Sequence, residues 1–199
     1  MKGKVYIAGL LLLLSLSLLS CGGGGGAPGS GSGDTGIEVQ SVLLSVESDD
    51  IDVFQNPSAC GTPPNLTPES PLTDALVTMD ITAVALNTDP TFSPFPANIE
   101  YCFVTYTSAV IGAPIIESKT INPNCSFSNG TTSCTLDLLN IARKTQWWDD
   151  VDSGKFVPAE RPTRYAVIYD CRYQNNFREE GKLGGRIEID LDDWLSCGG

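Results

Sequence analysis

The chain has 199 residues, with 24 acidic and 12 basic side chains, a formal net charge of -12 and no histidine. The acidic surplus argues against nucleic acid as a partner, because the phosphates would be repelled at close range. The lack of histidine excludes Ser-His and Cys-His nucleophile pairs and histidine-ligated zinc. An acid-base enzyme would need two facing carboxylates, and since no pair is marked by the pattern, we predict a protein that is not an enzyme.

Residues 1–20 have the layout of a secretory signal peptide. Lys2 and Lys4 precede an apolar run over residues 5–20. This run is shorter than the about 20 apolar residues that cross a bilayer as a helix, so a cleaved signal is favoured over a retained anchor.

Cys21 ends the tetrapeptide Leu-Leu-Ser-Cys at the close of this segment. The tetrapeptide resembles the lipobox of bacterial lipoproteins, in which the cysteine becomes the first mature residue and carries lipid. The chain has seven cysteines, and setting Cys21 aside leaves an even set suited to disulfides. Gly22 stands where an aspartate would mark inner-membrane retention. The resemblance implies lipid anchoring at Cys21 in the cell envelope, at the outer membrane of a diderm cell, with the domain in the periplasm or on the cell surface.

The segment after Cys21 predicts a tether followed by a single domain. Residues 22–36 are dominated by glycine and serine and form a flexible linker with a reach of roughly 20 Å. Residues 37–199 are long enough to bury a hydrophobic core, and their length fits one domain.

Alternating apolar residues predict strands along this domain. In the first half they cover residues 38–46, 73–86, 99–108 and 114–121, with a long proline-rich connection over 56–71. Asn129-Gly130 predicts a hairpin within residues 125–134. Residues 135–151 predict a strand that passes into a short helix, with Asp137 as its N-cap. Two further strands, 163–173 and 186–191, are predicted to be joined by a loop over residues 174–185.

About seven strands with at most one helix predict an all-β antiparallel sandwich. Tyr169 lies two residues before Cys171, which resembles the penultimate strand of immunoglobulin-like domains. That resemblance implies an immunoglobulin- or fibronectin-like sandwich. A lipocalin-like or other small β-barrel is the alternative, and the uneven connection lengths disfavour it.

The six remaining cysteines allow many pairings. We favour a local bridge across the Asn-Gly turn, a bridge between two predicted strands, and a bridge that attaches the proline-rich loop to the C-terminal end. The three pairs are Cys125 with Cys134, Cys102 with Cys171, and Cys60 with Cys197.

Two clusters suggest ligand sites. Asp149, Asp150 and Asp152 offer the hard oxygen ligands that calcium takes, although a solvated loop has the same composition. Trp147 and Trp148, if neighbours on a strand, would point to opposite faces. One could then pack in the core while the other stacks on a sugar or contacts a protein, and packing of both is the alternative.

These patterns predict a lipid-anchored, non-catalytic interaction or structural module of the cell envelope. Its partners would be the membrane, through the lipid on Cys21, and an unidentified envelope protein. A calcium- or carbohydrate-binding module on the cell surface is the alternative, and a carboxylate-dependent hydrolase is a third class. Calcium is the one cofactor that the composition suggests.

Overall fold

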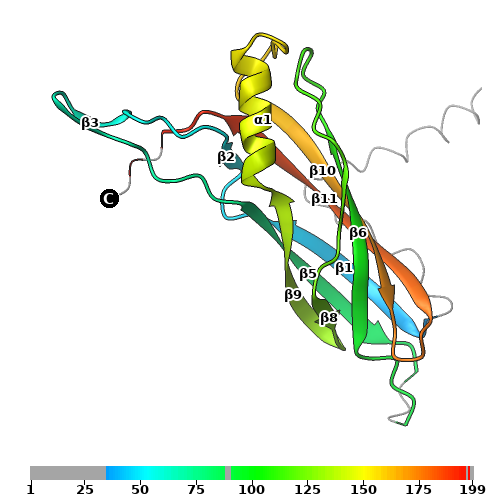
Figure 1. Ribbon diagram of the computed structural model, residues 1–199. Helices are drawn as coiled ribbons and strands as arrows, with labels where there is room; N and C mark the ends of the chain where they lie inside the picture. Colours follow the sequence, from blue (N-terminus) through cyan, green and yellow to red (C-terminus); the bar gives the residue numbers. More distant parts are fainter. Residues whose placement is uncertain (1–34, 88–90, 196, 198–199) are drawn as a thin grey trace, which may run out of the picture.

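Two β-sheets form the layers of the fold (Figure 1). The computed structural model describes residues 35–87, 91–195 and 197. The first sheet has the order β1-β5-β9 and is antiparallel throughout. Its strands are β1 (Ile37–Ser45), β5 (Ala75–Ala85) and β9 (Gly130–Leu139).

The second sheet has the order β2-β11-β10-β6-β7, and β8 pairs with a separate part of β6. Its pairs are antiparallel except β2 with β11, which is parallel. A small hairpin of β3 (Cys60–Thr62) and β4 (Asn65–Thr67) stands apart from both sheets. The strands of the second sheet are β2 (Asp50–Asp52), β6 (Ala97–Thr107), β7 (Lys119–Ile121), β8 (Cys125–Phe127), β10 (Thr163–Gln174) and β11 (Glu180–Asp192).

The core lies between the sheets and is built from the inward residues of each strand. On β5 and β10 every second side chain is buried, as the period of a strand with one packed face requires. Both strands were predicted, and the all-β sandwich is confirmed as two separate sheets. The buried members on these two strands are Val77, Met79, Ile81, Ala83, Tyr165, Val167, Tyr169, Cys171 and Tyr173.

The prediction of a loop over residues 174–185 is wrong. β10 extends to Gln174, which pairs with Glu180, so only residues 175–179 form the turn. The Asn175 side chain closes this turn by accepting from the backbone N–H groups of Phe177 and Glu179 at 2.9 and 2.8 Å. The chain therefore continues as a strand through the glycines that suggested a loop.

The glycines of β11 mark close packing against β10. A Cβ on Gly184 would lie 2.4 Å from the carbonyl oxygen of Tyr169. A Cβ on Gly181 would lie 2.2 Å from the Tyr173 ring. Glycine inside a strand often marks such an approach, and the sequence pattern does not separate this role from a turn.

The prediction of a hairpin around Asn129-Gly130 is also wrong. β8 pairs with β6 in the second sheet, whereas β9 pairs with β5 in the first. The turn therefore carries the chain from one sheet to the other, and Gly130 has the positive φ of 101° that this requires. The strand predicted over 114–121 is shorter than expected, since only β7 pairs with β6.

The helix α1 (Ile141–Asp152) follows β9 directly, and its N-cap is Asn140 rather than Asp137. Asn140 Oδ1 accepts from the backbone N–H of Arg143 at 3.0 Å. β9 extends through Asp137 because Leu136 and Leu138 on either side are buried. Asp137 instead forms an ion pair with Lys119.

The three disulfides pair as we favoured: Cys60 with Cys197, Cys102 with Cys171 and Cys125 with Cys134. Cys102 and Cys171 are directly opposed on β6 and β10, within one sheet. In immunoglobulin domains the conserved bridge joins the two sheets, so this bridge departs from that family. Disulfides are compatible with an oxidising, extracytoplasmic compartment.

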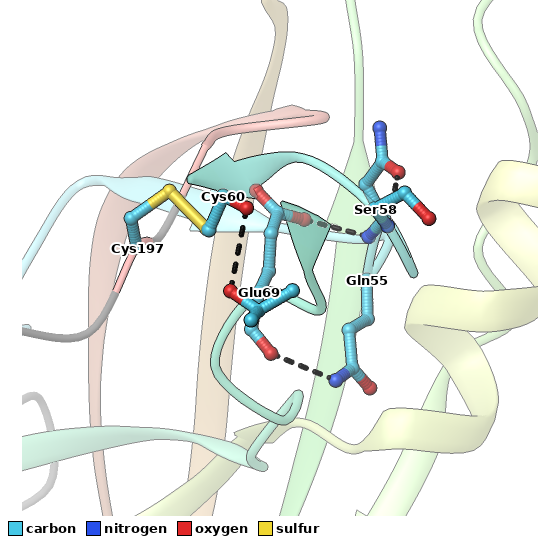
Figure 2. The surroundings of a disulfide bond; sticks show 7 residues. Gln55, Ser58, Cys60, Glu69 and Cys197 are labelled. Carbon is cyan, nitrogen blue, oxygen red and sulfur yellow. Dashed lines mark hydrogen bonds between the residues drawn. A yellow bond between two sulfur atoms is a disulfide. The ribbon is translucent and has the colours of Figure 1, made fainter. Parts of the chain in front are cut away.

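The Cys60–Cys197 disulfide attaches the proline-rich connection to the C-terminal segment (Figure 2). The same connection is held at its base by Glu69. The Glu69 carboxylate accepts from the backbone N–H of Asn56 at 2.6 Å, and its carbonyl accepts from Gln55 Nε2 at 2.9 Å. These contacts order a long segment that buries few apolar side chains.

Candidate interaction site at the helical end

The helix α1 covers one end of the sandwich and is anchored there by Trp147 (Figure 1). Trp147 is 2% exposed. Its indole N–H donates to the Tyr165 hydroxyl at 2.9 Å, and that hydroxyl donates to the carbonyl of Pro114 at 2.7 Å. One hydrogen-bonded chain therefore joins α1, β10 and the segment before β7.

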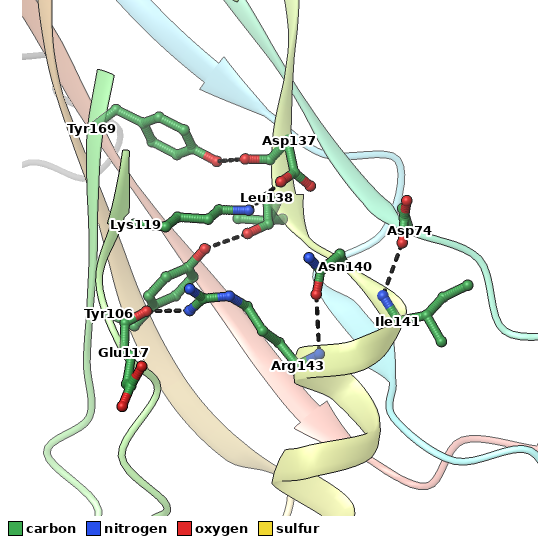
Figure 3. Close-up of polar contacts among 10 residues, drawn as sticks. All are labelled: Asp74, Tyr106, Glu117, Lys119, Asp137, Leu138, Asn140, Ile141, Arg143 and Tyr169. Carbon is green, nitrogen blue, oxygen red and sulfur yellow. Dashed lines mark hydrogen bonds and ion pairs between the residues drawn. The ribbon is translucent and has the colours of Figure 1, made fainter. Parts of the chain in front are cut away.

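Polar contacts close the edge of β9 against the second sheet (Figure 3). The Tyr106 hydroxyl donates to the Leu138 carbonyl, and the Tyr169 hydroxyl donates to the Asp137 carbonyl. Burial raises the pKa of both tyrosines well above the ordinary value. Burial also lowers the pKa of Lys119, and its ion pair with Asp137 opposes that shift. The tyrosines are neutral donors at physiological pH, and their role in this cluster is structural.

A groove of about 620 Å³ runs between α1 and residues 114–117. Trp147 and Phe156 line it, and hydrogen bonds between side chains or from a side chain to the backbone lie at both of its ends. At one end Arg143 donates to the Glu117 carbonyl (Figure 3). At the other end Asp150 accepts from Gln146 at 3.0 Å and from Lys155 at 2.8 Å. The groove therefore has a mixed polar and apolar lining, with Asp150 already paired at one end.

Trp148 lies on the other flank of α1, in a second groove of about 480 Å³. Its ring stacks on Phe54, with centroids 4.6 Å apart and an interplanar angle of 18°. The Arg161 guanidinium lies 5.6 Å from the ring centre. The premise that Trp147 and Trp148 are neighbours on a strand is wrong, because both lie on α1. Neighbouring side chains on a helix differ in direction by about 100°. Sugar stacking at Trp148 stays a prediction.

The three aspartates predicted to hold calcium diverge around the helix. Asp150 is buried at the first groove, whereas Asp149 and Asp152 are exposed and line the second. Within residues 35–87, 91–195 and 197, no group of three or more acidic or cysteine side chains is placed to hold a metal ion. The structure does not bring these carboxylates together as one ligand set, and calcium binding stays a prediction.

The predicted lipidation site lies outside the described residues, as do nearly all residues of the predicted tether. Within the described part of the chain, no helix has both the length and the apolar character needed to cross a membrane.

The sequence analysis missed an apolar tip formed by Ile111, Ile115 and Val157. These are 82%, 79% and 72% exposed, the largest fractions among the large hydrophobic side chains described. Two loops carry them and are joined by a hydrogen bond from the Ala159 N–H to the Ile111 carbonyl at 2.8 Å. Ile115 also lines the first groove. Val157, an isolated apolar residue inside a predicted loop, was an available signal, whereas Ile115 lies in the strand predicted over residues 114–121.

Comparisons with known proteins add little to this geometry. No protein family model and no curated protein matches the chain. One solved structure, described as the X-ray structure of Northeast Structural Genomics Consortium target SoR45, is 16% identical, covers 83% of this chain and 95% of that chain, and has a TM-score of 0.27. A similarity of this size carries no argument about fold or function.

Proposed function

We propose that the protein is a lipid-anchored, non-catalytic interaction module of the cell envelope. In this proposal the lipid on Cys21 holds the chain at the membrane and residues 22–36 form the tether. The apolar tip contacts an envelope protein. The support for the anchor is the sequence of the first 21 residues, and the support for the contact is the tip itself.

The observation that carries the contact is that three highly exposed apolar side chains lie on two loops whose backbones meet. Singly exposed apolar residues are normal on protein surfaces. An apolar cluster beside a groove is instead typical of a protein contact site. The backbones of the two loops pack closely, since a Cβ on Gly112 would lie 2.2 Å from the Val157 carbonyl oxygen. A preformed apolar surface loses little conformational entropy on binding.

Removal of the lipidated sulfur tests the anchor. We expect Cys21→Ala to move the exported protein from the membrane fraction to the soluble fraction, because the acyl chains provide the membrane affinity. Fractionation of cells and immunoblotting measure this, with mass spectrometry of the mature N-terminus as a second readout. A Cys21→Ala protein that is exported and stays with the membrane would overturn the anchor.

A photo-crosslinking residue at position 115 tests the contact in intact cells. We expect one discrete adduct with an envelope protein, and we expect Val157→Asp in the same chain to reduce its yield at least several-fold. The control is the same residue at Leu43 of β1, which is apolar and 50% exposed but lies away from the tip. Equal adduct yields at positions 43 and 115, or a yield at 115 unchanged by Val157→Asp, would contradict the contact.

A further inference from the structure

A third cavity lies where α1 begins, among the ends of β1, β2, β5 and β9, and contains an unpaired buried lysine. The cavity has a volume of about 580 Å³ and is lined by Lys144 of α1. Lys144 is 5% exposed. Within the described part of the chain its ammonium makes no hydrogen bond or ion pair.

The aliphatic stem of Lys144 is packed and its ammonium faces the cavity, where it has lost part of its hydration and gained no protein partner in exchange. Burial lowers the pKa of Lys144, while the more distant charges of Asp52 and Asp74 oppose this shift. These two carboxylates are held in place by the backbone. Asp52 Oδ1 accepts from the N–H groups of Phe54 and Trp194, both at 3.2 Å, and Asp74 Oδ1 accepts from the N–H of Ile141 at 2.8 Å.

The cavity therefore contains one donor, the Lys144 ammonium, and two fixed acceptors, the carboxylates of Asp52 and Asp74. The donor does not hydrogen-bond to either acceptor. Glu47 and Asp50 add two further carboxylates to its wall, and β1, β5 and β9 each add a serine or threonine hydroxyl. Four carboxylates repel an anion, and among the described residues no three of them are placed to hold a metal ion. A hydroxyl group, in contrast, accepts from an ammonium and donates to a carboxylate at the same time.

We propose that this cavity binds a neutral polyhydroxylated ligand, a sugar or a sugar alcohol, with Lys144 as donor and Asp52 and Asp74 as acceptors. The volume lies within the range of small-molecule sites. The cavity shares no lining residue with the apolar tip or with the grooves lined by Trp147 and Trp148, so it does not depend on the proposed protein contact.

Protection of Lys144 from acetylation in the full-length protein tests the proposal. The probes are glucose, galactose, N-acetylglucosamine and sorbitol, and mass spectrometry measures the modification rate at each lysine. At a concentration about ten times its Kd, a bound probe should slow the reaction at Lys144 roughly tenfold. Lys182, exposed on β11, is the internal reference and should not change. If all four probes leave the rate at Lys144 unchanged relative to Lys182, or if calcium or phosphate slows it instead, the proposal is overturned.

Lys144→Met provides a matched test, since it keeps the aliphatic stem and removes the charge. We expect a melting temperature equal to or above that of the wild type, and loss of the saturation-transfer NMR signal of the bound probe. Lys182→Met should keep the signal. Thr135→Val, at the exposed cavity wall on β9, should weaken it without unfolding the protein. A Lys144→Met protein that melts well below the wild type, or that still binds the probe, would show a structural lysine instead.

Discussion

Trp147→Ala is expected to lower the free energy of unfolding by about 3–5 kcal/mol, the range for truncating a large buried aromatic side chain. The loss has two parts. The indole leaves a cavity beneath α1, where Trp147 is 2% exposed. The Tyr165 hydroxyl also loses the hydrogen bond that it accepts from the Trp147 indole N–H at 2.9 Å. Its own hydrogen bond to the Pro114 carbonyl is kept.

Trp148→Ala is the matched control, one position along the same helix. Trp148 is only half-buried and contacts Phe54 and Arg161 at the surface. We expect a cost of about 1–2 kcal/mol for this change, since less apolar area returns to water. Urea unfolding followed by far-ultraviolet circular dichroism measures both. Equal losses for the two variants would show that α1 is not anchored through Trp147.

Loss of the Cys102–Cys171 disulfide is expected to cost about 4 kcal/mol. The bridge spans a sequence separation of 69 residues, and in the entropy model a closed loop of that length restricts the unfolded chain by about this amount. Both cysteines are fully buried in the core between the sheets. The change to make is Cys102→Ala together with Cys171→Ala, so that no free thiol is left.

The short bridge between Cys125 and Cys134 is the natural comparison. Its sequence separation is 9 residues, and the same model gives about 2.5 kcal/mol for removing it. Urea unfolding of the two double-alanine proteins measures the difference. If removing the short bridge costs as much as removing the long one, loop entropy is not the source of the stabilisation.

Several features of this protein follow from local pattern alone. The strands around Met79 and Val167 were predictable because a side-chain period of two depends only on neighbours in the chain. The cysteine pairing could be favoured, among many possible pairings, because of an even set, a turn between two cysteines and a loop with little apolar content. The proposed lipid anchor at Cys21 rests on local pattern too, because the segment that predicts it is continuous.

Other features depend on which segments meet. The sequence pattern around Gly184 predicts a loop. In the structure a Cβ on Gly184 would lie 2.4 Å from the Tyr169 carbonyl oxygen, so the glycine allows two strands to pack closely. The dipeptide Asn129-Gly130 predicts a hairpin, but β8 and β9 on either side of it belong to different sheets. In both cases the residue type permits two structures, and contacts with distant parts of the chain select between them.

The candidate sites show the same division. The sequence indicated Trp147 and the aspartates of α1 as unusual, because bulky aromatic and clustered acidic residues stand out in a linear pattern. It could not indicate Lys144, since a lysine on a short helix is ordinarily solvated. Only the folded chain buries Lys144 to 5% exposure in a cavity whose wall also carries carboxylates from β2 and the segment before β5. Burial and the spacing of charges are properties of the packed layers, so the tertiary structure alone decides where a ligand would find them.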